Sequence, residues 1–391
     1  MESNLRFKRG LRRAKAKAVD FIANKGKQNM IIIAALAALV LIFAVLNPNF
    51  LGKYNIVSMA QSLAPYAILG LGVTFVIATG GIDLSIGTVC IASAVIAGKL
   101  YMVGMPLWIT IPVMIAIGTI FGYINGLLVA KLKLPAFIAT LGTMMFARGL
   151  SAIIVSIPNI FYPNGTWFNR VFSNANGVPT GLIWVIGLAL VCMYLMYKCK
   201  IGRYILSIGS NEEATRLSGI NTDKYKVIAY TFSGMGAGIA AIFWAASFAT
   251  VAAATGNGME LDAIAGVYIG GTSAAGGVAS IAGTVIGNMM LVVIRSGLNF
   301  VLARFNLNLN STYVTYVLTG IIVVVAVLMD VIKNKNAGKV KVETEKEKAK
   351  RLYKQKLEEK EYEIDAVLAS DMQKAEKNAR INELEKEIAS L

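Results

Sequence analysis

Two hydrophobic halves of the chain are separated by a polar connector, Lys198 to Lys226, whose centre reads Ser210-Asn211-Glu212-Glu213-Ala214-Thr215-Arg216-Leu217-Ser218-Gly219-Ile220-Asn221. Ser210 or Asn211 can cap the start of a helix, the acids of the first turn favour its dipole, and Gly219 is a typical residue at its end. A helix of about two turns is too short and too polar to cross a bilayer. We expect it to lie on the membrane face, either as a plain surface helix or as a docking site for a partner protein.

The composition is that of a membrane protein. Of 391 residues, 56% are hydrophobic and only 15% are charged, which predicts a polytopic α-helical protein embedded in the lipid bilayer. The net charge of +16 could indicate a nucleic-acid partner, but nine Lys and Arg lie in residues 1–29 and most others lie in loops. Basic residues on the cytoplasmic side explain this distribution better, so we expect no nucleic acid.

Metal, disulfide and cofactor sites are not indicated by the residue types present. The three cysteines, Cys90, Cys192 and Cys199, lie in or beside apolar runs without a CxxC pair, and the chain has no histidine. We therefore expect no metal site, no disulfide framework and no bound cofactor.

Ten apolar runs predict about ten transmembrane helices, so the expected fold class is all-α. Residues 258–301 are the ambiguous region, because they are too long for one crossing and are interrupted by Gly270-Gly271-Thr272-Ser273-Ala274-Ala275-Gly276-Gly277. The runs cover residues 30–46, 60–79, 85–103, 107–130, 136–157, 181–197, 227–252, 258–272, 278–301 and 313–332.

The distribution of charge divides the chain into three parts. The segment 1–29, with nine basic and two acidic residues, is expected to lie on anionic lipid in the cytoplasm. The transmembrane domain covers 30–332. The tail 333–391, with fifteen basic and thirteen acidic residues, is predicted to be a charged cytoplasmic helix. An even number of crossings places both termini and the connector in the cytoplasm, as the positive-inside rule requires.

Ionisable residues inside the membrane are functional candidates by default. Here they are Asp83, Arg148, Glu260, Asp262 and Arg295, which together do not make a catalytic set. Asp83 lies between glycines that should break the helix, and the freed backbone groups would need a water-lined cavity. The alternative is that Asp83 and Asp262 are only helix caps and partners of a helix dipole.

Two glycine-rich breaks resemble each other. The first reads Gly80-Gly81-Ile82-Asp83-Leu84-Ser85-Ile86-Gly87, and the second begins at Gly270-Gly271 and leads to Ser280-Ile281-Ala282-Gly283-Thr284. Paired interruptions in two halves indicate a transport pathway, although glycine-rich packing faces could produce the same pattern. We predict that the pathway is lined by Gly80, Gly81, Asp83, Ser85, Glu260, Asp262, Gly270, Gly271, Thr272 and Ser273.

The sequence lacks a nucleotide-binding motif. None of its Gly-Lys pairs has the earlier glycine of a P-loop, so any ATP that drives the protein binds to another chain. Gly234-Met235-Gly236-Ala237-Gly238 lies inside an apolar span and predicts close helix packing rather than a dinucleotide site. The chain is therefore predicted not to be an enzyme.

Four motifs, in order, carry a resemblance to a known family. From about Asn47 to Lys333 the chain resembles the permease subunit of bacterial ABC importers for monosaccharides, of the ribose, galactose and xylose type. It differs from such permeases in its charged tail, its basic N-terminal extension and Ala274-Ala275. The motifs are the first break; Leu134-Pro135-Ala136-Phe137-Ile138-Ala139-Thr140-Leu141-Gly142-Thr143-Met144 with Arg148-Gly149-Leu150; Gly209 to Ile220; and Glu260-Leu261-Asp262-Ala263-Ile264-Ala265 with Gly270-Gly271-Thr272-Ser273 and Gly283-Thr284.

The resemblance implies a set of partners in the cytoplasmic (inner) membrane of a bacterium. These are a second permease copy that forms a homodimer, a cytoplasmic ABC ATPase and an extracytoplasmic sugar-binding protein. The protein would be a gated path for the sugar, with no chemistry on it. The resemblance also implies that the connector couples to the ATPase through Asn211, Glu212, Glu213, Ala214, Thr215, Arg216, Leu217, Ser218, Gly219 and Ile220.

Other functions fit parts of the sequence. An ion-coupled secondary transporter could use Asp83, Glu260 or Asp262 as its coupling carboxylate, but the missing histidine and the helix-capped connector weigh against it. ABC permeases for nucleosides and autoinducers are similar to those for sugars. A membrane scaffold whose charged tail is the active part is the remaining alternative.

Overall fold

The computed structural model divides the chain into two compact units, Met1–Ile332 and Lys333–Leu391, and each is described by itself. The predicted basic segment 1–29 lies outside the described residues, except for the first residues of helix α2. The described residues are 27–155, 159–252, 255–305, 313–321, 324–325, 327–328, 356, 359–360, 362–364, 367 and 374–390.

Helices make up almost all of the regular structure, which confirms the all-α fold class. The described strands are the two-residue β1 (Ile160–Phe161) and β2 (Thr250–Val251), paired antiparallel. The long helices are α2 (Lys27–Leu46), α3 (Lys53–Ala78), α4 (Ile86–Met102), α5 (Leu107–Gly126), α6 (Ala136–Val155), α8 (Gly181–Tyr197), α11 (Thr222–Phe248) and α13 (Ile281–Arg304). The short helices are η2 (Pro48–Leu51), η3 (Leu127–Lys131), α7 (Trp167–Phe172), α9 (Lys200–Ser210), α10 (Glu212–Leu217) and α12 (Met259–Ile269).

Membrane-crossing helices are present where the apolar runs predict them. Within the described residues, α3, α5 with η3, α6, α11 and α13 are long and apolar enough to cross, and α8 with α9 would be a sixth if this pair, bent by 67°, is one span. Each of the first nine predicted runs contains a helix, and 313–321 of the tenth run is helical. The count of ten crossings stays a prediction.

The ambiguous region contains one helix that is too short to cross a membrane. Helix α12 has 11 residues, or about 16 Å of length, which is roughly half of the hydrocarbon core. It ends at Ile269, directly before the second break, and is almost fully buried. A short buried helix followed by a loop is the form that a broken segment takes inside a bundle.

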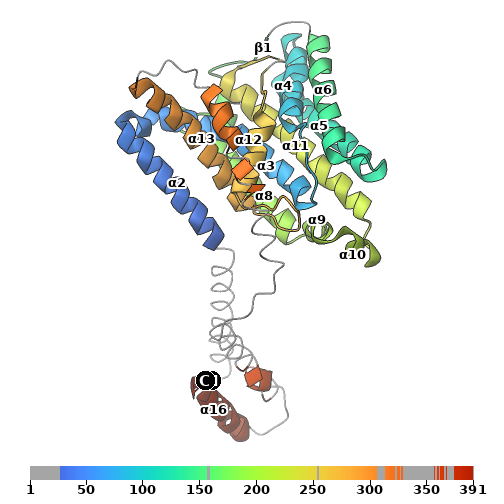
Figure 1. The fold of residues 1–391 in the computed structure, drawn as a ribbon, viewed down its shortest axis with the longest axis vertical. Coiled ribbons are helices and arrows are strands. Elements are labelled where there is room, and N and C mark those ends of the chain that lie inside the picture. Colours follow the sequence, from blue (N-terminus) through green and yellow to red (C-terminus); the bar gives the residue numbers. More distant parts are fainter. Residues whose placement is uncertain are drawn as a thin grey trace. The chain divides into compact units, whose positions relative to one another are not determined.

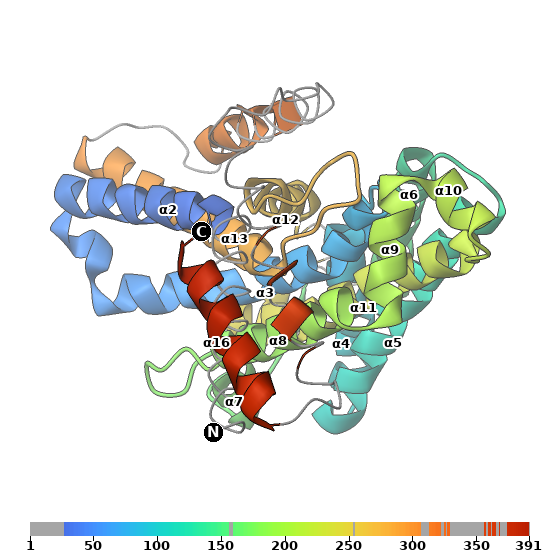
Figure 2. The ribbon, with the colours of Figure 1, turned by 90° about the horizontal axis from the view of Figure 1, so that it is seen from below.

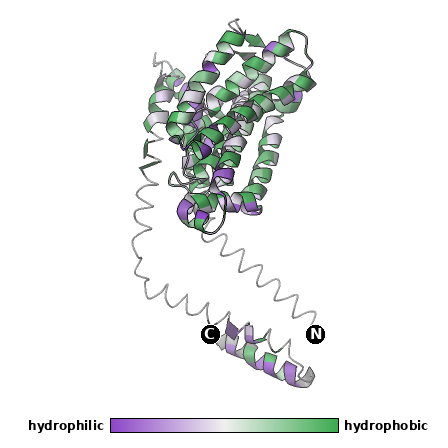
Figure 3. Ribbon diagram, turned by 90° about the vertical axis from the view of Figure 1, so that its right-hand side faces the viewer, coloured by the Kyte–Doolittle hydropathy of each residue, from purple (hydrophilic) through white to green (hydrophobic). Residues whose placement is uncertain are grey.

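Helix α11 lies at the centre of the first unit, against α3, α4 and α5 (Figures 1 and 2). Figure 3 shows that the helices of the first unit are coloured mostly as hydrophobic. Glycines allow the close approach: a Cβ on Gly122 would collide with the carbonyl of Tyr230 and the backbone of Gly234, and one on Gly236 would lie 3.0 Å from Cα of Gly72. The predicted close packing through Gly234–Gly238 is confirmed.

The second unit contains α16 (Lys374–Ser390), a charged helix as predicted. Three apolar side chains, Ile364, Ile381 and Leu384, are buried together, so this helix packs against the helical residues 362–364. Lys360 joins the two parts by ion pairs to Glu363 and Glu387. The tail therefore forms a small packed unit with its own apolar contact, rather than a fully solvated helix.

We predict opposite effects for alanine at two helical glycines of the first unit. Gly122→Ala should lower stability by about 1–3 kcal/mol, because the methyl group would separate α5 from α11. Gly187→Ala on α8 is the matched control: it meets open space and should raise stability slightly through helix propensity. Unfolding of the purified protein by SDS in mixed micelles measures both, and equal stability of the two variants would contradict the packing.

Candidate functional site

The connector forms two helices, and the second matches the predicted one. Helix α10 begins after Asn211, whose side-chain oxygen accepts from the Ala214 amide at 2.9 Å. Of the two predicted caps, Asn211 is therefore the cap, while Ser210 ends α9 and donates to a carbonyl of its own helix. Helix α10 ends at Leu217, and Gly219 has φ +81°. The predicted start and end of this helix are confirmed.

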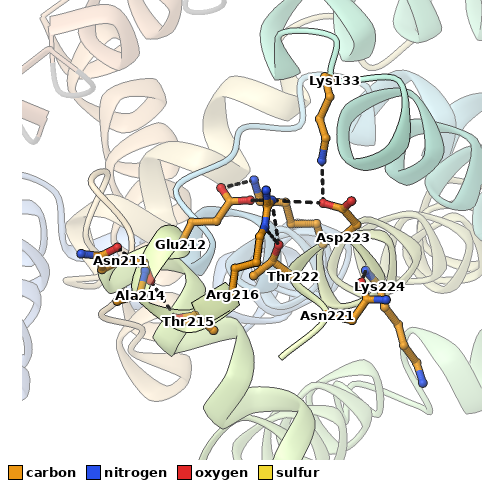
Figure 4. Close-up of polar contacts among 11 residues, drawn as sticks. Lys133, Asn211, Glu212, Ala214, Thr215, Arg216, Asn221, Thr222, Asp223 and Lys224 are labelled. Carbon is orange, nitrogen blue, oxygen red and sulfur yellow. Dashed lines mark hydrogen bonds and ion pairs between the residues drawn. The ribbon is translucent and has the colours of Figure 1, made fainter. Parts of the chain in front are cut away.

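A cluster of charges fixes α10 to its surroundings (Figure 4). Glu212 forms ion pairs with Lys226 at 2.6 Å and with Arg216 at 3.1 Å, and Asp223 forms one with Lys133 at 2.6 Å. Partial burial raises the pKa of Glu212, but the hydrogen bond from Lys226 and the charges of Lys226, Arg216 and Lys133 lower it more, so this pKa lies below its usual value. The ion pairs of Glu212 with Lys226 and Arg216 therefore stabilise the fold at neutral pH, and this contribution is lost as acid protonates Glu212.

The outward face of α10 has no partner within the described part of the chain. Leu217 is 84% exposed, and Glu213, one turn earlier on the same helix, is also exposed. Thr215 is buried and bonds Ser207 of α9 at 2.8 Å. Helix α10 is therefore held from one side by α9 and α11, and its other side is exposed. The remaining predicted coupling residues, Ala214, Ser218, Gly219 and Ile220, are exposed or half-buried.

The first break places Asp83 at the centre of a buried hydrogen-bond network. Asp83 is only 1% exposed. One carboxylate oxygen accepts from the amide and hydroxyl of Ser85, at 3.0 and 2.6 Å, and the other accepts from Ser233 of α11 at 2.8 Å. Asn125 of α5 donates to Ser85 at 2.9 Å and accepts from Thr143 of α6 at 2.6 Å.

This network joins four elements. The cap residue of α4 is Ser85, and Asp83 accepts from the amide and hydroxyl of Ser85 rather than from an amide of the helix, so Asp83 is not itself the helix cap that the sequence offered as an alternative. The sequence analysis missed Ser233, Asn125 and Thr143, because isolated polar residues in apolar helices give no signal of which neighbour they face. The predicted place of Asp83 and Ser85 in a water-lined path stays a prediction.

The second break lies against the first. The amide of Gly277 donates to the carbonyl of Ala78, the last residue of α3, at 3.0 Å. A Cβ on Gly276 would lie 2.7 Å from the amide of Gly80 and 2.9 Å from Cα of Gly209, which belongs to α9. We call this contact of Gly80, Gly209, Gly276 and Gly277 the glycine junction. It brings the two breaks, which resemble each other in sequence, to one place beside the connector.

The other predicted residues of the second break lie close by. Gly270 packs against Gly283 so closely that a side chain would collide with its backbone. Gly271 has φ +86°. Both Gly271 and Gly81 of the first break are half-buried. The Thr272 hydroxyl accepts from the Ser280 amide at 3.1 Å, and Thr272 and Ser273 are both buried. The residues proposed for the path thus surround the junction, except Glu260 and Asp262.

The two acids of α12 have different surroundings from Asp83. Glu260 packs against Gly87 near the start of α4. Asp262 forms an ion pair with Arg295 of α13 and accepts from Thr319 at 3.3 Å. Arg295 also donates to Tyr66 at 2.8 Å and lies over its ring. A carboxylate paired in this way is compensated inside the membrane.

Arg148, the remaining ionisable candidate, donates to Thr88 of α4 at 3.3 Å. Among the residues that the structure describes, no group of three or more His, Cys, Asp or Glu side chains could hold a metal ion. Asp83, Arg148, Asp262 and Arg295 thus have polar partners on other helices, whereas Oε2 of Glu260 is buried without a hydrogen-bond partner among the described residues.

A comparison with known proteins identifies the fold's family. A family model described as the permease component of branched-chain amino acid transport systems matches residues 55–327. The chain belongs to this permease family. The permease is thus a multi-pass protein of the cell membrane and a transport subunit rather than an enzyme. No solved structure matches it.

Several relatives of the permease are import permeases. It is 36% identical over 309 residues to the ribose import permease protein RbsC of Escherichia coli K12, with 76% of this chain and 91% of the relative covered. The ribose import permease protein RbsC of Bacillus subtilis 168 is 34% identical over 75% of this chain and 89% of the relative. The fructose import permease protein FruF of Bifidobacterium longum is 33% identical over 72% and 84%. The resemblance that the four motifs predicted is confirmed.

We predict that asparagine can replace Asp83 and leucine cannot. Asp83→Leu leaves three buried donors of Ser85 and Ser233 without their acceptor, at about 1–3 kcal/mol for each. Asp83→Asn keeps one acceptor oxygen, and the Ser233 hydroxyl can turn to accept from the new amide. SDS unfolding measures both variants, with Ile82→Leu as the control. Equal destabilisation by asparagine and leucine would show that the charge of Asp83, and not its hydrogen-bond acceptors, is required.

Proposed function

We propose that the permease is the transmembrane subunit of an ATP-driven importer for a monosaccharide of the ribose, galactose or xylose class. The support is its identity of up to 36%, over most of both chains, with permeases named for ribose and fructose import. The sugar passes through unchanged, because the chain supplies a path and no catalytic set.

The complete importer needs further subunits. A cytoplasmic ABC ATPase binds the nucleotide, since the permease has no P-loop spacing of its own. A second copy of the permease forms a homodimer with the first, and an extracytoplasmic binding protein delivers the sugar. The lipid-facing first segment 1–29 and the charged tail 333–391 flank a permease domain of residues 30–332.

Both termini and the connector lie in the cytoplasm in this proposal. The connector carries six Lys and Arg between Lys198 and Lys226, and the loop after α5 adds Lys131 and Lys133. Helix α3 ends at the glycine junction, beside α9, so its first residue, Lys53, lies at the opposite end of the bundle, about 38 Å away along the helix axis. The basic residues therefore gather at one end of the bundle.

The glycine junction is the observation that carries the proposed coupling. Gly209 lies two residues before the cap of α10 and packs against backbone atoms of Ala78, the last residue of α3, and of Gly277 in the second break. A movement of α10 by the ATPase would therefore displace Gly80, Gly276 and Gly277 directly. The breaks form the gate of the sugar path, together with Gly81, Asp83, Ser85, Glu260, Asp262, Gly270, Gly271, Thr272 and Ser273.

We predict that a charge at Leu217 uncouples transport. Leu217→Asp should lower ATP-dependent uptake at least about tenfold in proteoliposomes that contain permease, ATPase and binding protein, because a desolvated carboxylate would replace an apolar contact. Val178→Asp, also at an exposed apolar residue but on a loop far from α10, is the matched control. Glu213→Ala removes one rim charge and should cost only about 0–1 kcal/mol of ATPase binding.

The assignment of α10 depends on the Leu217 result. Wild-type uptake and wild-type ATPase binding by Leu217→Asp would show that α10 is a plain surface helix. Loss of uptake in Val178→Asp to the same extent would show a general effect of the charge. Uptake that persists without ATP and follows an ion gradient would overturn the importer itself in favour of a secondary transporter.

A second prediction concerns the junction. Gly209→Ala should leave binding of the ATPase unchanged, because α10 and its charge cluster keep their contacts, but should lower the sugar moved per ATP hydrolysed. The ratio of uptake to ATP hydrolysis in the same proteoliposomes measures this, with Gly187→Ala as the control. An unchanged ratio in Gly209→Ala would remove the junction from the coupling.

A further inference from the structure

A polar groove lies between α3 and α13, away from the glycine junction. It encloses about 230 Å³. Residues of α3 at positions 55, 58 and 62 and residues of α13 at positions 295, 296 and 299 face each other across it, each set at the three- and four-residue spacing of one helix face. Its polar lining consists of Asn55, Ser58, Ser62, Arg295, Ser296 and Asn299.

Part of this lining is built and part is open. Ser296 donates to Asn55 at 2.7 Å, and Asn55 donates to the Phe50 carbonyl at 2.7 Å, so these two side chains are fixed. Ser58, Ser62 and Asn299 make no side-chain hydrogen bond to the described residues, and Nε of Arg295 is buried without a hydrogen-bond partner there. A buried donor such as Nε of Arg295 is costly unless water or a ligand satisfies it, and the exposed side chains of Ser58 and Asn299 are available to bond such a ligand.

The groove has hydrogen-bonding groups but little net charge. Arg295 is neutralised by its ion pair with Asp262 and is held by Tyr66. An anion would find no free positive charge there, whereas a neutral molecule with many hydroxyls could satisfy the open groups. The rings of Phe248 and Phe300 also line the groove and offer apolar faces for the C–H side of such a molecule.

The position of the groove suits the first step of import. Ser62 and Asn55 lie 16 and 23 residues before Ala78, so the groove is about 24 to 35 Å from the glycine junction along α3. In the proposed orientation this is the extracytoplasmic end. Asp262, which pairs with Arg295 at the groove, belongs to α12, the helix that leads directly into the second break.

We propose that this groove is the outer sugar-binding site of the permease, where Ser58, Ser62 and Asn299 bond hydroxyls of a neutral monosaccharide before the breaks open. The proposal rests on the proposed function. It adds a site that the glycine-rich breaks do not include, and it makes the ion pair of Asp262 and Arg295 the connection between that site and α12.

The test measures uptake at several ribose concentrations. Ser58→Ala and Asn299→Ala each remove an open polar group without breaking a bond of the fold, and each should raise the KM for radiolabelled ribose by about threefold to tenfold. The amount of purified, folded permease should not change. Asn257→Ala, at an exposed asparagine outside the groove, is the matched control.

A direct readout uses a cysteine at Ser58 in a protein whose Cys90, Cys192 and Cys199 are replaced. Ribose, or galactose or xylose in parallel samples, should slow labelling of Ser58→Cys by a hydrophilic thiol reagent at least threefold, and should not affect Asn257→Cys. A protected Ser58→Cys together with a raised KM in the alanine variants supports the site.

Three outcomes overturn it. If the parent takes up ribose and the alanine variants have the parental KM, the groove is not a sugar-binding site, and the proposed function stays intact. Cross-linking of two copies through Ser58→Cys, with labelling that ignores every sugar, would show that a second permease copy covers this face. Uptake of no monosaccharide by the parent refutes the proposed function and this site with it.

Discussion

A bilayer offers no water to a backbone amide or carbonyl that a helix has released, so the two breaks depend on partners from the surrounding protein. At the first break, Tyr230 donates to the carbonyl of Ile82 at 3.2 Å, and the Thr140 hydroxyl accepts from the Leu84 amide at 3.2 Å. At the second break, Thr272 satisfies a backbone amide in the same way. Helices α11 and α6 must therefore be in place before the first break is stable, and the conformation of the break depends on the whole bundle.

The sequence predicted those features that depend on local signals. The apolar runs locate the helices, and Asn211 and Gly219 define α10, because caps act within one turn of the chain. Helix starts were less accurate. Helix α3 begins at Lys53 and α11 at Thr222, several residues before the apolar runs, because polar turns extend these helices past their hydrophobic parts. Hydropathy records only the segment that lies in lipid.

The arrangement of the site depends on contacts between distant residues, which a single sequence does not reveal. Gly80, Gly209 and Gly276 are far apart in the chain, and a glycine at a turn, a helix contact or a helix end looks the same. The acids make the same point. Asp83 is satisfied by hydroxyls and Asp262 by a guanidinium, and only the packing of α11 and α13 assigns these partners. The sequence singled out both residues as ionisable groups inside the membrane unit, but could not distinguish their partners.

The glycine junction has a mechanical consequence. Where two helices touch through side chains, a change of rotamer can absorb a small displacement without moving the backbone. At the junction the backbones touch directly, and glycines have no side-chain rotamers that could absorb a displacement. A small shift of α9 would therefore displace the end of α3 with little loss. The absence of side chains makes this contact stiff, which is the mechanical property that the proposed coupling requires.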